Sequence, residues 1–173
     1  MPQTIHVFPD LRLVFNGETY RCALGKNGVV PEADAREGDD ATPAGVYPIR
    51  EVWHRADRVP LPPLNFPVHE ITPADGWCDA PDHPDYNRHV TLPFPASHEE
   101  MWFDNPGYDV VIVIGHNDDP VVPHMGSCIF WHVARPDYSP TRGCVAQSIE
   151  DLLAILPQLT SGAQMHIHAE VNW

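Results

Sequence analysis

Short apolar runs separated by turn residues predict a chain built mainly from β-strands. Apolar or alternating runs occupy residues 4–7, 11–15, 18–24, 46–52, 108–114, 129–133 and 164–171. This length and spacing are typical of strands. Asn16-Gly17 lies between the second and third runs, where it predicts a tight hairpin turn. The chain is therefore expected to belong to the mainly β class.

One segment has the pattern of a helix instead. Ser148 with Asp151 three residues later forms a capping box at its start. The apolar positions that follow mark a side facing the core: Ile149, Leu152, Leu153, Ile155 and Leu156. A helix is predicted from here to about Leu156. The strands and this one clear helix together indicate a sandwich-like single domain covering residues 1–173.

Three stretches between the predicted strands are rich in turn residues. Residues 31–45 are acidic and predict a loop, and the prolines of residues 59–67 preclude a helix there. Residues 71–89 combine many turn residues with Trp77 and Tyr86. Long loops that carry aromatic side chains tend to form the walls of binding sites.

The charge of the chain narrows the classes of partner. It has 24 acidic residues against 10 basic ones, a formal net charge of -14. Such a surface repels phosphate backbones and anionic lipids, so neither nucleic acid nor a membrane is an expected partner. No apolar run is long enough to span a bilayer. The oligomeric state is not indicated.

The first residues bear on the location of the protein. They lack the basic and apolar regions of a secretory signal. A cytoplasmic location is therefore expected for the sequence as given. A periplasmic location follows instead if export uses another route or if the numbering begins after a removed signal.

The cysteines and histidines were considered as metal ligands. The four cysteines fit no zinc spacing and are expected to be reduced thiols: Cys22 and Cys128 in the core, Cys78 in a polar loop, and Cys144. His166 and His168 place two rings on one face of the last strand, but a catalytic zinc needs about three converging ligands. We expect no metal and no other cofactor, and we interpret these two rings as the solvated face of an edge or sandwich strand.

The segment from His132 to Cys144 is the strongest candidate for chemistry. A thiol becomes a useful nucleophile when a base takes its proton and backbone N–H groups hold the oxyanion that forms. His132 lies on a predicted strand, and residues 134–143 are long enough for the chain to double back and bring the thiol to the imidazole. Gly143 lets another segment approach its backbone closely. The alternative is a buried free cysteine beside a core histidine.

Three stretches in this order resemble the L,D-transpeptidase catalytic domain family. His132 followed by Thr141-Arg142-Gly143-Cys144 is similar to the family's strand histidine, loop and [S/T]-x-G-C motif. Residues 40–47 resemble its T-P-x-G-aromatic segment, and residues 76–79 with Tyr86-Asn87-Arg88 resemble a segment of a short single-domain branch. The matches span roughly residues 10–157. Many members have a histidine where this chain has Arg142, so no role of that histidine is carried over.

The resemblance implies the family's sandwich-like fold and a cysteine enzyme that acts on peptidoglycan stem tetrapeptides. The bond attacked would join the third-position diamino acid to terminal D-alanine. Cys144 would be the nucleophile and His132 the base, with the N–H groups around Gly143 as the oxyanion hole. We further expect the imidazolium of His132, assisted by Arg142, to lower the pKa of the thiol against the surrounding acids.

Arg142 and four other residues are candidates for holding the substrate. Arg142 is interpreted either as a clamp for a substrate carboxylate or as a partner in a surface ion pair. The other candidates for holding the acyl donor are Thr141, Trp77, Asn87 and Arg88.

The resemblance allows two fates for the thioester intermediate. Cross-linking needs a polymeric wall outside the cytosol, whereas a cytoplasmic enzyme meets soluble muropeptides and uses water. The sequence therefore favours an L,D-carboxypeptidase. The alternatives are a periplasmic L,D-transpeptidase that forms 3-3 cross-links or exchanges D-amino acids, and a non-catalytic module that binds peptidoglycan through Trp77 and Tyr86.

Overall fold

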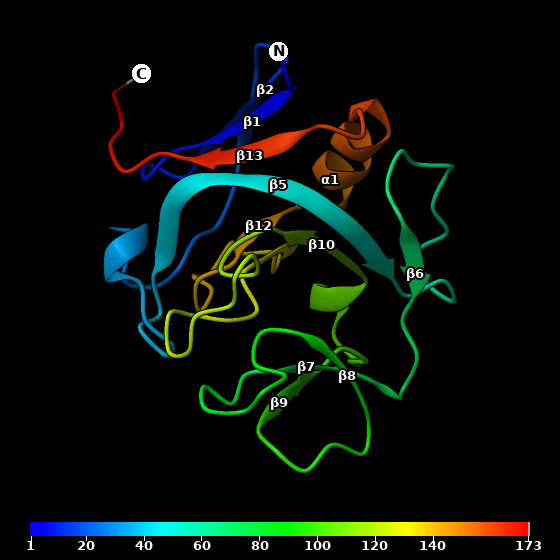
Figure 1. Cartoon of the computed structure of the whole chain (residues 1–173). Helices are drawn as coiled ribbons and strands as arrows, with labels where there is room; N and C mark the ends of the chain where they lie inside the picture. The colour runs from blue at the N-terminus through cyan, green and yellow to red at the C-terminus, as the bar shows by residue number, and fades with distance from the viewer. Residues whose placement is uncertain (173) are drawn as a thin grey trace.

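One long strand, β5 (Thr42–His54), organises the computed structural model, which describes residues 1–172. Successive parts of β5 pair with β4 (Val29–Pro31), with β13 (Gln164–Ile167) and with β10 (Val110–Ile114). Figure 1 shows β5 arching across the molecule between these neighbours. The strand therefore lies in the middle of the main sheet and joins its two halves.

The main sheet holds ten strands and curls until its edges meet. Its order is β12-β11-β10-β5-β13-β1-β2-β3, with β4 and β6 paired to β5 outside this path. The remaining members are β1 (Thr4–Val7), β2 (Arg12–Phe15), β3 (Glu18–Arg21), β6 (Val68–Glu70), β11 (Phe130–Val133) and β12 (Val145–Gln147). Just after β3, Ala23 exchanges two backbone hydrogen bonds of 2.8 and 2.9 Å with Ala146 of β12. The sheet is thus nearly closed into a barrel.

The main core lies between this curled sheet and the helix α1 (Ile149–Ile155). The Ser148 hydroxyl accepts the Asp151 N–H at 3.2 Å and caps the helix, while Leu152 and Ile155 are buried. A 3-10 turn, η3 (Leu156–Gln158), continues α1, and two others are η1 (Glu32–Asp34) and η2 (Pro106–Tyr108). The predicted mainly β fold with one clear helix is confirmed.

A second, smaller sheet covers part of the first. β7 (Asp75–Cys78) lies between β8 (His89–Thr91) and β9 (His98–Glu100). The expectation that residues 71–89 form only a loop was therefore wrong, because both partners of β7 lie beyond the reach of a local pattern. The small sheet lies at the bottom of Figure 1, at the opposite end of the molecule from β1 and β13.

Other sequence-based boundaries also differ from the structure, most of all at residues 31–45 and 164–171. Residues 31–45 were expected to be a loop, but they include η1 and the start of β5, where pairing with β4 orders the chain. The last strand was expected at residues 164–171, but β13 ends at Ile167. It lies between β5 and β1, so it is not an edge strand.

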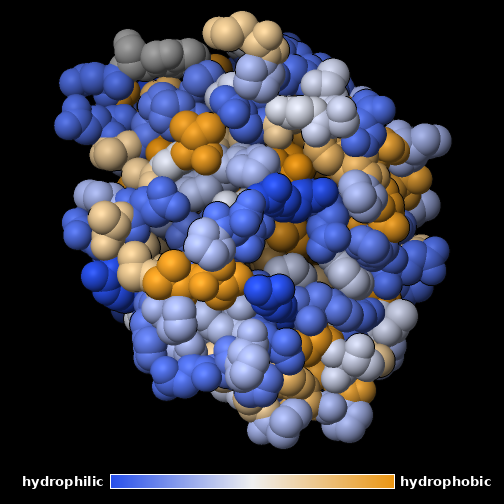
Figure 2. Space-filling model, viewed as in Figure 1, coloured by the Kyte–Doolittle hydropathy of each residue, from blue (hydrophilic) through white to orange (hydrophobic). Residues whose placement is uncertain are grey.

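The hydrophilic surface of the described chain agrees with the many charged residues of its sequence, and its helices agree with the lack of a long apolar run. Hydrophilic side chains cover most of the face seen in Figure 2, and the apolar patches on it are separate from one another. None of the helices within residues 1–172 combines the length and apolar character needed to cross a membrane.

Candidate active site

Cys144 lies directly before β12, beside the strand β11 that carries His132. By the register of the parallel β11–β12 ladder, Cys144 is level with Phe130. Because alternate residues of a strand share a face, Phe130, His132 and Cys144 project from the same side of the sheet. The loop of residues 134–143 doubles back as predicted and brings the two segments side by side.

The thiol is buried and bonded to the backbone of its neighbours. Its Sγ donates to the Cys128 carbonyl oxygen at 3.1 Å and accepts the Phe130 N–H at 3.4 Å, and Cys144 is 8% exposed. The Nδ1 of His132 donates to the Val133 carbonyl oxygen at 2.9 Å. Among residues 1–172, no hydrogen bond joins His132 to Cys144, so the two groups are neighbours with separate partners.

Burial sets the protonation state of both groups. It raises the pKa of Cys144 to about 12; the negative charge of Glu99 adds to the effect, and the Phe130 N–H opposes it. Burial also lowers the pKa of His132 below its usual value, although hydrogen bonding with the backbone of Val133 and Gly107 acts in the opposite direction and raises it. The expectation of a thiolate paired with an imidazolium was therefore wrong for this resting state, in which both groups are neutral near pH 7.

The Thr141–Cys144 turn is locked by its own side chains and by a distant segment. The Thr141 hydroxyl donates to the Cys144 carbonyl oxygen at 2.7 Å and accepts the Gly143 N–H at 3.1 Å. Gly143 has a φ of 136°, and a Cβ added there would lie 2.7 Å from the Ala41 carbonyl oxygen. The predicted close approach at Gly143 is thus made by Ala41, which lies in the second family-like stretch. The direct role predicted for Thr141 in substrate binding stays a prediction.

Two residues that the sequence did not indicate, Tyr108 and Glu99, lie close enough to the thiol to interact with it electrostatically. Tyr108 donates its hydroxyl to Glu99 Oε2 at 2.6 Å, and its ring meets the His132 ring edge-on at a centroid distance of 5.3 Å. Burial raises the pKa of Glu99 and the charges of Asp79 and Glu37 add to the effect, while the Tyr108 hydrogen bond and, more weakly, Arg142 oppose it. No motif marks Glu99, because its effect on Cys144 depends on where the small sheet docks.

Asn87 connects three segments around the site. Its Oδ1 accepts the Trp77 Nε1–H and the Cys128 N–H, both at 3.1 Å. Its Nδ2 donates to the carbonyl oxygens of His116 and Asn117 at 3.0 and 2.8 Å. The amide could therefore contact a substrate, as predicted, only by giving up one of these bonds. The geometry gives Asn87 a positioning role, and its direct contact with the substrate stays a prediction.

The other predicted binding residues differ in exposure. Trp77 is buried and meets the Phe130 ring edge-on at 5.1 Å, so it packs under the small sheet. Arg142 and Arg88 are exposed. Neither side chain forms a hydrogen bond or ion pair with residues 1–172, so the surface ion pair considered for Arg142 is not formed within them. The carboxylate clamp stays a prediction.

The remaining cysteines are all buried and unbridged. Cys22 and Cys128 lie in the core as predicted. Cys78 was expected in a polar loop, but it ends β7 and is fully buried, and burial raises its pKa. It therefore belongs to the packing of the small sheet.

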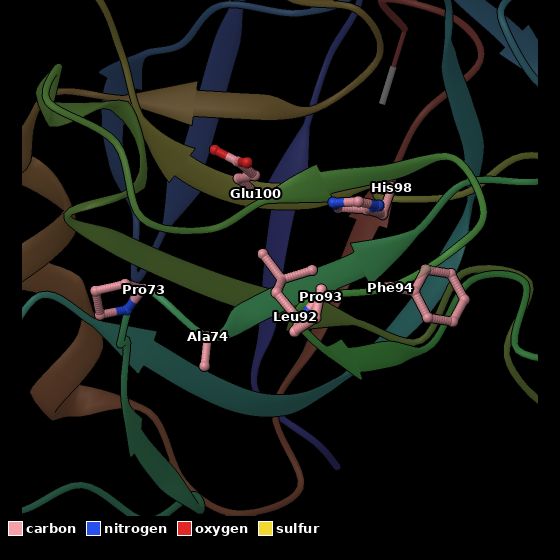
Figure 3. A pocket seen from close by; sticks show the side chains of 7 residues that line it. All are labelled: Pro73, Ala74, Leu92, Pro93, Phe94, His98 and Glu100. Carbon is pink, nitrogen blue, oxygen red and sulfur yellow. The ribbon is translucent and has the colours of Figure 1, made fainter.

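A surface pocket of about 550 Å³ lies on the small sheet and the loops beside it, and Cys144 is not among its lining residues (Figure 3). Its lining residues are Pro73, Ala74, Leu92, Pro93, Phe94, His98 and Glu100. His98 and Glu100 of β9 line this pocket, whereas Glu99 between them bonds to Tyr108. β9 thus separates this pocket from the thiol. Within the described residues, the grouping of side chains able to hold a metal lies elsewhere, on β1, on β13 and on the residue that follows β13.

Comparisons with known proteins identify a matching family model and a solved structure that aligns with the chain. The family model described as the L,D-transpeptidase catalytic domain (YkuD) matches residues 3–167. A solved structure, an L,D-transpeptidase from Mycobacterium smegmatis, aligns with a TM-score of 0.41 and 13% identity over 97% of this chain. This chain spans 59% of the length of that protein. No curated protein sequence matches the chain.

Proposed function

The chain belongs to the L,D-transpeptidase catalytic domain family, and on this basis we propose that Cys144 and His132 carry out acyl transfer on peptidoglycan stem peptides. The supporting observation is that the two side chains project from one face of adjacent strands. The substrate is proposed to be the stem tetrapeptide, attacked at the bond between the diamino acid and terminal D-alanine. The domain that does this is proposed to be single and to cover residues 1–173.

The reaction begins from a neutral thiol and a neutral imidazole. As Sγ bonds to the carbonyl carbon, the thiol proton passes to the ring nitrogen of His132 that holds a lone pair. The carbonyl oxygen becomes an oxyanion, held by N–H groups of the Thr141–Cys144 turn other than those of Thr141 and Gly143, which already donate within the protein. When the carbon–nitrogen bond breaks, the imidazolium returns the proton to the amine of D-alanine. The product of this step is a thioester on Cys144.

Attack requires one local rearrangement. In the resting state the thiol hydrogen is bonded to the Cys128 carbonyl oxygen. It must exchange this partner for His132 when the substrate binds, as catalytic hydrogen bonds commonly tighten only in the Michaelis complex. The burial of Cys144 keeps the thiol protonated until that point.

Arg142 is proposed to bind the carboxylate of the terminal D-alanine. Its guanidinium is exposed two residues before the nucleophile. The carboxylate of D-alanine is one residue from the scissile carbonyl, so a group at this position can reach it. A planar guanidinium binds a carboxylate with two parallel hydrogen bonds. Arg142→Ala is expected to raise KM for the tetrapeptide with little change in kcat.

Hydrolysis is the proposed fate of the thioester. Cys144 is 8% exposed, so water reaches it more readily than a second stem peptide. Water, deprotonated by His132, would attack the thioester, release Sγ as the thiol and leave a tripeptide stem. This activity fits soluble muropeptides in the cytoplasm, whereas transfer to an amine would fit the periplasmic wall.

The test is mass spectrometry of the protein with a disaccharide-tetrapeptide in ¹⁸O-labelled water, with and without a D-amino acid. Loss of one alanine with ¹⁸O in the new carboxyl group is expected, and Cys144→Ala should abolish it. Exchange of the terminal residue would establish a transpeptidase instead. Binding of the muropeptide with no product from the wild-type protein would indicate a non-catalytic module.

A further inference from the structure

Three histidines from the two ends of the sequence meet on the main sheet. In the parallel β1–β13 ladder, His6 is paired with His166. His168 follows β13, and its N–H donates to the Val7 carbonyl oxygen at 2.8 Å, which fixes the backbone of His168 beside β1. Both strands lie at the opposite end of the molecule from the small sheet (Figure 1). The arrangement is therefore separate from the proposed active site.

The ring nitrogens of these histidines converge. One nitrogen from each ring lies within 4.8 Å of one nitrogen from each of the others. The Nδ1 of His6 and the Nε2 of His168 are 2.9 Å apart, and the rings of His166 and His168 stack at a centroid distance of 3.7 Å. All three side chains are half-buried.

The β1–β13 pairing already holds the three imidazoles together, so the fold has met the conformational cost of gathering them before an ion binds.

We propose that His6, His166 and His168 bind one divalent transition-metal ion, with Zn²⁺ as the expected occupant, through one nitrogen of each ring. Two nitrogens on one tetrahedral zinc lie about 3.3 Å apart, given zinc–nitrogen bonds of about 2.0–2.1 Å. All three nitrogens lie within 4.8 Å of one another, so the distances fit one ion once the stacked rings of His166 and His168 tilt until their nitrogens converge. In the His6–His168 contact one ring donates and the other accepts, so the donor ring moves its hydrogen to its other nitrogen when both bind the ion.

The ligand set selects the class of ion. Imidazole suits zinc, copper and nickel, whereas magnesium and calcium require oxygen ligands. Three protein ligands leave a fourth position for water. The ion would join β1, near the N-terminus, to the end of β13. Its expected effect is therefore on stability and not on the chemistry of Cys144.

Variants that keep the rings can separate metal binding from aromatic packing. His166→Phe keeps a ring to stack on His168 but removes the ligand nitrogen, and His6→Phe does the same on β1. His98→Phe and His124→Phe alter histidines outside the cluster and serve as matched controls. All are made in the full chain without an affinity tag of histidines.

The measurement is equilibrium dialysis with Zn²⁺ followed by metal analysis, together with thermal unfolding with and without Zn²⁺. One zinc per chain and a rise in Tm are expected for the wild type and both controls. The His166→Phe variant should bind at least about tenfold more weakly and lose the rise in Tm. Co²⁺ should give a d–d spectrum without the charge-transfer band of a thiolate ligand.

The proposal fails if the wild type binds no zinc, or if His166→Phe and His6→Phe bind it as tightly as the controls. Either result would show that the three rings only pack together. A thiolate band with Co²⁺ would place the ion on a cysteine and would also overturn the proposal. If the phenylalanine variants fold with an unchanged Tm without metal, any loss of binding is assigned to the missing nitrogens.

Discussion

The protonation of Cys144 and His132 decides how the proposed reaction can begin. A thiol whose pKa is raised to about 12 is protonated at neutral pH, and a histidine whose pKa is lowered is unprotonated there. The nucleophile must therefore be generated during attack and not before it. The immediate cause is burial under the small sheet, with the nearby charge of Glu99 as a second contribution.

The pH dependence of the reaction follows from this state. Turnover needs neutral His132, so kcat/KM should rise with pH through the lowered pKa of His132, below 6.5, and stay level through neutral pH. Iodoacetamide reacts with the thiolate, so alkylation of Cys144 should rise about tenfold per pH unit from about pH 7 to 9. Peptide mapping separates Cys144 from the other thiols. An alkylation rate that is already level at neutral pH would contradict the neutral pair.

Glu99 offers a direct test of the electrostatic cause. Glu99→Gln removes the charge that raises the pKa of Cys144 and keeps an oxygen to accept the Tyr108 hydroxyl. Alkylation of Cys144 at fixed pH should become about two- to tenfold faster, because one pKa unit corresponds to a tenfold change in thiolate. Glu100→Gln, on the pocket-lining side of β9, is the matched control and should leave the rate unchanged.

At the scale of elements, the position of Cys144 depends on how the turn before it packs against the start of β5. Gly143→Ala places a Cβ 2.7 Å from the Ala41 carbonyl oxygen at a φ of 136°. Unfolding should become easier by about 1–3 kcal/mol, and kcat should fall at least about tenfold because the thiol shifts. Chemical denaturation and steady-state kinetics measure the two effects. Gly162→Ala, where a Cβ meets open space, should change neither by much.

Asn87 holds the small sheet to the loops around β10 and β11. Asn87→Ala removes four hydrogen bonds, so we expect a loss of about 2–4 kcal/mol in the free energy of unfolding. Asn65→Ala removes one bond, to the Leu159 carbonyl oxygen, and should cost less. If Asn87 acted mainly on the substrate, its variant would instead raise KM with an unchanged Tm.

The sequence predicts the structural features that depend on residues close together in the chain. It misses those that depend on residues far apart in the chain. The helix after Ser148 and the buried strand, expected at residues 108–114 and found at 110–114, follow from local patterns, and so does the His132–Cys144 segment. The small sheet, the interior place of β13 and the Glu99–Tyr108 pair do not. Each depends on contacts between segments whose register is set only when the whole chain has folded. The same limit hid the His6–His166 pairing, which joins residues about as far apart as the chain allows.

At the scale of the whole molecule, the segment after β3 closes the main sheet against β12. Ala23 and Ala146 each donate a backbone hydrogen bond to the other. β12 also follows Cys144 directly, so this closure braces the strand on which the thiol is placed. A nearly closed barrel leaves few unpaired strand edges. The two amides should therefore open only when the sheet itself opens.

Native-state hydrogen exchange tests this closure. The amide hydrogens of Ala23 and Ala146 are expected to exchange through global unfolding, with protection about equal to that of β10 and a strong dependence on denaturant. The Asn27 amide is an internal control, because it makes a bond of 2.9 Å to the Asp40 carbonyl oxygen in an exposed turn. It should exchange by local opening, at least about a hundredfold faster. Equal exchange of Ala23, Ala146 and Asn27 would mean that the sheet edges part in solution, and Cys144 would then lie on a strand free to move.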